Sequence, residues 1–108
     1  MLRSFGRLNF IKRTMSLKVD HDATSRKFVL SGVPDAYLEY NVLPDNNLDL
    51  LHTFVSPEHR GKGYAAIIVK GAFDYARENG LKVVPTCTYI STYLKKCPAE
   101  SDLLRANL

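Results

Sequence analysis

The stretch LDLLHTFVSPEHRGKGYAAIIVKGAFDYARENG, residues 48–80, joins two patterns that predict different secondary structure. Residues 48–55 carry apolar side chains on both faces of an alternating pattern, which is typical of a central β-strand. One face of that strand is expected to carry Leu48, Leu50, His52 and Phe54. From Gly63 the apolar residues recur with helical spacing, and Asn79-Gly80 predicts the helix end. The stretch therefore predicts a strand, a glycine-rich loop and a long helix.

Further strands are predicted before this stretch, and a strand and a helix after it. Residues 26–30 are rich in β-formers, residues 36–42 alternate with a period of two, and turn residues separate these segments. Residues 81–84 predict a short strand, and the apolar spacing of residues 90–94 indicates a second, short helix. With 108 residues, the chain suits a single domain. We expect an α/β protein of the α+β type, with a mixed, mostly antiparallel sheet.

Charge and composition exclude several classes of protein. The net charge is +4, but the first 18 residues hold five basic and no acidic residues, so the remainder is close to neutral. A near-neutral body offers no basic stripe to nucleic-acid phosphates, so we expect no nucleic acid as partner. No apolar run is long enough to span a membrane. Cys87 and Cys97 form neither a disulfide framework nor a zinc pattern, so we expect no metal and an intracellular location.

The two ends of the chain are expected to lie outside the domain. Residues 1–16 are basic and acid-free and contain Arg, Ser, Leu and Phe, a composition that fits a mitochondrial transit peptide or a disordered leader. Residues 17–98 are expected to form the domain, and residues 99–108 a C-terminal tail. The location is therefore expected to be cytoplasmic or mitochondrial.

The junction between the central strand and the long helix predicts an anion-binding loop. Gly61 and Gly63 lie at a helix start, where unpaired backbone amides and the helix dipole favour negative charge. Arg60 and Lys62 would add positive charge, and a tight turn without a ligand is the alternative. The residue order does not match a Walker loop, because Tyr64 follows the second glycine where that loop requires lysine. It also fits no dinucleotide fingerprint, because the preceding strands read as antiparallel.

The order Arg60-x-x-Gly63-x-Ala65, after a strand and before a helix, resembles the Q/R-x-x-G-x-G/A loop of the GNAT superfamily of N-acetyltransferases. Over about residues 17–98 the chain is similar to the short, single-domain members of that superfamily. Two further matching segments are His52-Thr53-x-Val55 and Val84-Pro85-x-Cys87-x-Tyr89. The resemblance implies acetyl-coenzyme A as the cofactor and a primary amine, on a small molecule or a protein lysine, as the acceptor.

The same resemblance implies where the cofactor binds. The pyrophosphate would lie on the loop amides, and the pantetheine arm would pair with the end of the central strand, as a peptide adds to a strand edge. The cofactor-binding residues would be Phe54, Val55, Arg60, Gly61, Lys62, Gly63, Tyr64 and Ala65.

Acetyl transfer also needs a group that removes a proton from the amine and a donor for the departing thiolate. His52 is the candidate base, and a histidine bonded within the core is the alternative. By the resemblance Tyr93 is the candidate proton donor, and a buried aromatic anchor is the alternative. By the resemblance Cys87 lies near the thiol end of the cofactor, where it would either take up the acetyl group as a nucleophile or line the thioester pocket.

The expected function is therefore transfer of an acetyl group from acetyl-coenzyme A to an amine. The alternative is a coenzyme A-binding module or an adaptor without significant turnover. A small domain with an exposed strand edge is expected to be a monomer or a weak dimer.

Overall fold

The computed structural model describes residues 17–105, and the leader expected over residues 1–16 lies outside the described residues. A five-stranded sheet has the order β1-β2-β3-β4-β5. Its strands are β1 (Val19–Asp22), β2 (Lys27–Leu30), β3 (Val33–Val42), β4 (Leu48–Val55) and β5 (Val83–Val84). Consecutive strands are antiparallel, except that β5 pairs with β4 in parallel. The α+β fold with a mostly antiparallel sheet is confirmed.

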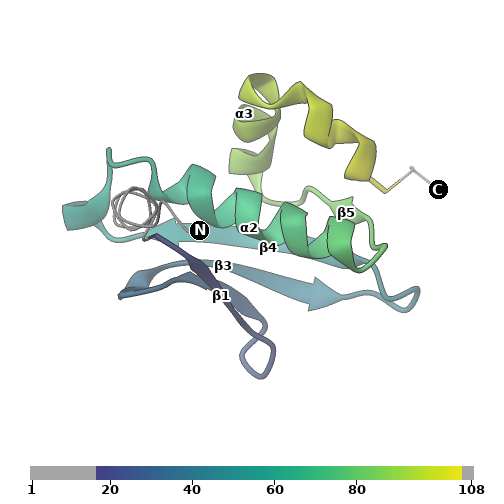
Figure 1. Cartoon of the computed structure of the whole chain (residues 1–108), viewed down its shortest axis with the longest axis horizontal. Coiled ribbons are helices and arrows are strands. Elements are labelled where there is room, and N and C mark those ends of the chain that lie inside the picture. Colours follow the sequence, from purple (N-terminus) through teal and green to yellow (C-terminus); the bar gives the residue numbers. More distant parts are fainter. Residues whose placement is uncertain (1–16, 106–108) are drawn as a thin grey trace, which may run out of the picture.

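The long helix α2 (Tyr64–Glu78) lies across one face of the sheet (Figure 1). It begins directly after Gly63, as the spacing predicts. Its buried stripe consists of Ile68, Val69, Ala72, Phe73 and Ala76. This stripe packs on the buried residues of β2, β3 and β4, so the sheet and the helix share one hydrophobic core. Across residues 17–105, no helix combines the length and the apolar character needed to cross a membrane.

A β-bulge in β4 changes which side chains share a face. Glu39 pairs with His52, but Tyr40 pairs with Leu50, so Leu51 is an extra residue in β4. Because one extra residue reverses the alternation of a strand, His52 lies on the sheet face opposite α2, whereas Leu50 is buried beneath the helix. The expectation that Leu48, Leu50, His52 and Phe54 share one face is therefore wrong.

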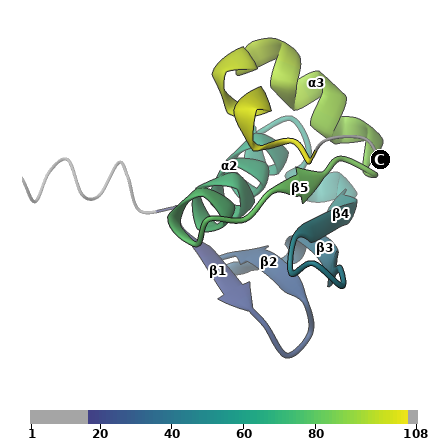
Figure 2. The ribbon, with the colours of Figure 1, turned by 90° about the vertical axis from the view of Figure 1, so that its right-hand side faces the viewer.

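The segment that follows β5 folds over the end of the sheet. It comprises α3 (Thr88–Lys96) and the 3₁₀-helix η2 (Pro98–Leu103), and Figure 2 shows both above β5. The short helix expected over residues 90–94 is confirmed.

Residues 99–105 pack against the domain and do not form the expected tail. The side chain of Leu103 belongs to the core and is only 5% exposed. Leu104 forms a β-bridge with Val83, and Arg77 on α2 forms ion pairs with Glu100 and Asp102. The sequence alone does not reveal this, because the two adjacent leucines, Leu103 and Leu104, produce no periodicity.

Candidate functional site

The strands β4 and β5 separate soon after they pair. They are paired only at Leu48–Val83 and Asp49–Val84, and the Cys87 amide then donates to the Leu50 carbonyl at 2.8 Å. Two local features cause the separation: Pro85 ends β5, and the bulge in β4 bends that strand. Within the described residues no strand pairs with this edge of β4 beyond Leu50. The C-terminal half of β4 is therefore open to an extended ligand.

A cleft of about 280 Å³ lies at this opening. It is bounded by the end of β4, the loop, the start of α2 and the first turn of α3. Its lining residues are His52, Thr53, Phe54, Val55, Arg60, Ala65 and Tyr89. The structure thus brings together five residues that the sequence analysis selected, and it adds Thr53 and Tyr89.

The loop beside the cleft has the backbone of an anion-binding site. Gly61 and Gly63 have φ values of 83° and 79°, in the left-handed region that favours glycine. Between residues 17 and 105, no acceptor pairs with the backbone amides of residues 61–66. Gly63 is the N-cap of α2 and provides no side-chain cap. Successive free amides at a helix start form a concave site for negatively charged oxygen atoms.

The two basic residues of the loop have different surroundings. The Arg60 Nε donates to the Val55 carbonyl at 2.8 Å, which fixes the loop to the end of β4. The ammonium of Lys62 lies 6.0 Å from the centre of the Tyr64 ring, at the outer limit of a cation–π contact. Lys62 is exposed and therefore free to approach a phosphate.

His52 lies on a wall of the cleft and is exposed to solvent. Its ring is stacked near that of Phe54, with 6.4 Å between the ring centres. The alternative of a histidine bonded within the core is therefore wrong, because the bulge turns this residue away from the core.

Cys87 lies just behind the cleft, as the N-cap of α3. Its side chain is buried, and its sulfur lies 3.3 Å from the hydroxyl oxygen of Thr53, which lines the cleft. Either of the two atoms can donate this hydrogen bond. The Thr53 side chain therefore lies between the Cys87 thiol and the cleft.

Tyr93 does not line the cleft. Its ring packs on Phe73, with 5.5 Å between ring centres, and its hydroxyl donates to Glu100 Oε2 at 3.2 Å. Burial, together with the negative charge of Glu100, raises the pKa of Tyr93. The cleft instead contains Tyr89, one helical turn earlier, and burial raises the pKa of Tyr89 as well. The motif that ends at Tyr89 was the signal that could have identified it.

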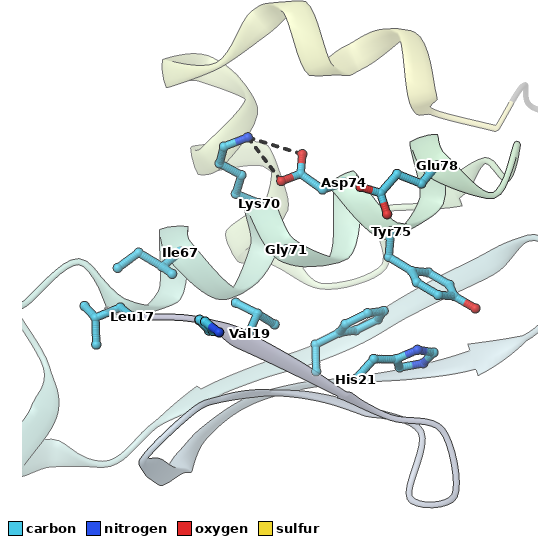
Figure 3. Close-up of a pocket in the computed structure, with 11 residues that line it drawn as sticks. Leu17, Val19, His21, Ile67, Lys70, Gly71, Asp74, Tyr75 and Glu78 are labelled. Atoms are coloured by element: carbon cyan, nitrogen blue, oxygen red, sulfur yellow. Dashed lines mark hydrogen bonds and ion pairs between the residues drawn. The ribbon is translucent and has the colours of Figure 1, made fainter. Parts of the chain in front are cut away.

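A second, larger cavity of about 670 Å³ lies at the other edge of the sheet, between β1 and α2 (Figure 3). His21 and Phe28 stack at its floor beside Tyr75, and the His21 Nε2 bonds the Tyr40 hydroxyl at 2.5 Å. Burial lowers the pKa of His21. At the rim, Lys70 and Asp74 form an ion pair at 3.2 Å. This cavity is separate from the cleft, because β1 and β5 are opposite edges of the sheet.

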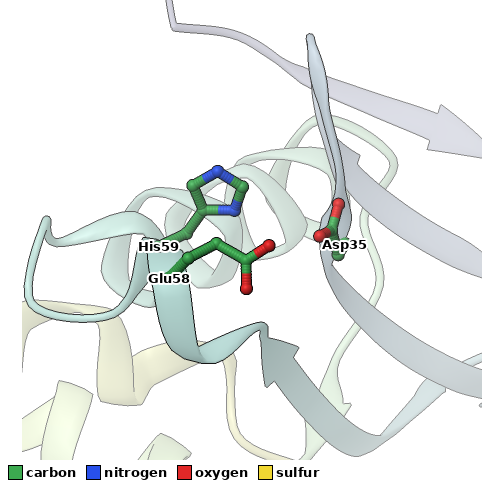
Figure 4. A group of neighbouring side chains, drawn as sticks. All are labelled: Asp35, Glu58 and His59. Atoms are coloured by element: carbon green, nitrogen blue, oxygen red, sulfur yellow. The ribbon is translucent and has the colours of Figure 1, made fainter.

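Asp35, Glu58 and His59 form a small cluster where the start of β3 lies beside the segment that follows β4 (Figure 4). Each residue offers one ligand atom, and these atoms lie within 4.8 Å of one another. The His59 Nδ1 also bonds the Ser56 hydroxyl at 3.1 Å. The set could hold a divalent cation, but Glu58 is exposed and such clusters are common without an ion, so we assign no metal site here.

An open edge of β4, a glycine loop with free amides and a helix that starts from it define an acyltransferase fold of the GNAT type. In agreement, the sequence model of the GCN5-related N-acetyl-transferase family matches residues 27–103, and the chain belongs to this family.

Individual relatives agree with this assignment. The chain is 37% identical to Protein NATD1 of Xenopus tropicalis over 101 residues, which is 91% of this chain and 93% of that protein. It is 36% identical to Protein NATD1 of Homo sapiens over 101 residues, covering 91% of this chain and 89% of that protein. The solution structure of a GCN5-like protein from Staphylococcus aureus superposes with a TM-score of 0.64 at 25% identity, over 85% of this chain and 91% of that one.

Proposed function

We propose that the protein transfers an acetyl group from acetyl-coenzyme A to a primary amine. The observation that carries this proposal is the run of free backbone amides over residues 61–66, directly beside the open edge of β4. Membership of the GCN5-related family supports the reaction type.

The residues of the cleft fit the cofactor. The amides of the loop would hold the pyrophosphate, and Lys62 would add a positive charge. Phe54 and Val55 would pair through their backbone with the amide groups of the pantetheine arm. Arg60 would hold the loop against β4 through its bond to the Val55 carbonyl. When bound, acetyl-coenzyme A supplies an acetyl group activated as a thioester.

His52 is the proposed base of the site. An alkylammonium with a pKa of about 10.4 is neutral in only about one molecule in a thousand near pH 7.4, a deficit of roughly 4 kcal/mol. His52 lines the cleft, so its imidazole is placed to accept the proton that the ammonium must lose. During transfer a bond forms between the amine nitrogen and the acetyl carbon, and the carbon–sulfur bond breaks. The ammonium loses two protons in all. One proton passes through His52 to solvent, and the other balances the proton that the sulfur gains.

The proton for sulfur is better placed on Tyr89 than on Tyr93. Tyr89 lines the cleft, whereas the Tyr93 hydroxyl is bonded to Glu100 on η2. We therefore propose Tyr89, in place of Tyr93, as the proton donor for the departing thiolate. For Cys87 we propose a supporting role, because its buried sulfur bonds Thr53.

Two measurements test the proposal. Titration calorimetry of the full chain with acetyl-coenzyme A should show binding, since even a weak site worth about 4 kcal/mol is half filled near 1 mM ligand. Gly63→Glu should abolish binding by placing a carboxylate among the free amides. Gly80→Glu is the matched control, because Gly80 has φ 67° but lies at the far end of α2. No heat change for the wild type would refute the proposal. Binding without release of a thiol in the presence of amines would leave only a coenzyme A-binding module.

A further inference from the structure

The sheet face opposite α2 carries a concentration of acidic and aromatic residues. Neither α2 nor α3 covers this face (Figure 2). The strand register arranges its side chains in two neighbouring rows. One row is Asp20, Val29, Tyr37 and Phe54, and the next is Asp22, Lys27, Glu39 and His52. We call these eight residues the open face.

The charge around the open face is negative. It carries three carboxylates and one lysine. Asp35 on β3 and Asp49 on β4 lie on the same side of the sheet. Basic groups also lie near it: Arg26 donates to Asn41 at 3.4 Å, and Arg60 shares the cleft lining with His52 and Phe54. Since the part of the chain after residue 18 is nearly neutral, this face holds a local excess of negative charge.

The open face already binds an alkylammonium of its own chain. The Lys27 Nζ lies 4.3 Å from the centre of the Tyr37 ring, which is a cation–π contact. Tyr37 in turn lies against Phe54, with 5.5 Å between ring centres. The aromatic surface therefore extends from Lys27 to the cleft.

The open face and the cleft are continuous. His52 and Phe54 belong to the open face and also line the cleft. A group that lies on this face can reach the cleft without crossing another element. Because the face spans four strands, roughly 14 Å at the usual strand spacing, and no helix covers it, it suits an extended ligand better than a small amine. Its separated carboxylates instead match several cations of one extended chain.

We infer that the open face is the acceptor-binding surface and that its ligand is an extended, lysine-containing basic segment of a polypeptide. This inference rests on the proposed function, because it names the acceptor of the same site. One lysine of the segment lies over Phe54 and reaches His52, and its neighbours pair with Glu39, Asp20 and Asp22.

The experiment measures binding without the cofactor. The full chain is titrated into a fluorescein-labelled peptide of alternating glycine and lysine, and anisotropy is recorded at low and at high salt. Asp20→Asn and Glu39→Gln are the test variants, because within residues 17–105 neither side chain makes a hydrogen bond or an ion pair that the substitution would break. Glu78→Gln, an exposed carboxamide substitution on α2, is the matched control.

Binding that falls about 1.5- to 5-fold with each test variant, weakens with salt and is unchanged by Glu78→Gln would support the inference. No peptide binding, or equal binding by the wild type and the test variants, would overturn it. Self-association through the open face that excludes the peptide would overturn it too. Acetyl-coenzyme A calorimetry on the same samples separates this failure from failure of the proposed function. If the cofactor binds and a small monoamine is acetylated but the peptide is not, the function stands and the inference fails.

Discussion

The sulfur of Cys87 lies 3.3 Å from the hydroxyl oxygen of Thr53, across the gap that opens between β4 and the start of α3. This contact joins two segments whose strands have already separated. It places a buried thiol directly behind the wall of the cleft.

The Cys87–Thr53 contact predicts that the thiol is not the acetyl carrier. Cys87→Ala should keep most of the turnover and lower the free energy of unfolding modestly, because it removes a weak hydrogen bond and a small buried volume. Steady-state thiol release with an amine acceptor measures the turnover, and urea denaturation measures the stability. Complete loss of turnover in a folded Cys87→Ala protein, together with an acetylated intact wild type in mass spectrometry, would establish the covalent route instead.

The position of His52 on the cleft wall predicts that this residue accepts a proton during turnover. His52→Gln should lower kcat/KM by roughly 10²- to 10⁴-fold, because the variant loses the proton acceptor. The affinity for acetyl-coenzyme A, measured by calorimetry, should stay the same. An unchanged kcat/KM in His52→Gln would show that another group takes the proton.

Burial of His21 predicts that stability depends on pH in the mildly acidic range. Burial lowers the pKa of His21, and Asp22 opposes this in part. The folded protein therefore favours the neutral imidazole, so its contribution is fully present above the unfolded value of about 6.5 and is lost as pH falls from there through the folded value. His21→Phe keeps the ring stacked on Phe28 and should flatten the fall in unfolding free energy between about pH 7.5 and 5.5. Equal falls in both proteins would contradict this prediction.

The close approach of β1 to α2 predicts that Gly71 resists substitution. A β-carbon at residue 71 would lie 2.7 Å from the Val19 Cβ, which is a steric overlap. Overpacking of this kind costs about 1–3 kcal/mol, whereas replacing a mid-helix glycine by alanine gains only about 1 kcal/mol. Gly71→Ala should therefore lower the free energy of unfolding, and the double variant with Val19→Ala should recover part of the loss. A more stable Gly71→Ala protein would refute the close contact.

The burial of Leu103 predicts that the C-terminal segment stabilises the domain. Leu103→Ala should reduce the free energy of unfolding by about 2–5 kcal/mol, the usual cost of such a truncation in a core. Leu17, which is 43% exposed, provides the control, and Leu17→Ala should change little. Equal midpoints in urea for Leu103→Ala and the wild type would mean that residues 99–105 are indeed only a tail.

The sequence by itself determined the order of a central strand, a glycine loop and a long helix. These features depend on residues that are neighbours in the chain: the spacing of apolar residues in α2, and the two glycines whose φ angles open the loop. The family resemblance rests on short sequence motifs in the same region, so the sequence alone is sufficient to recognise it.

Only the tertiary structure decided which side chains reach the cleft. The bulge at Leu51 depends on pairing with β3, and it moved His52 from the expected core face to the open face. Packing of α3 on Phe73 turned Tyr93 toward Glu100 and left Tyr89 at the cleft. The acidic open face likewise arises from strands that are distant in the chain, because cross-strand register, not sequence spacing, makes Asp20, Glu39 and His52 members of one surface.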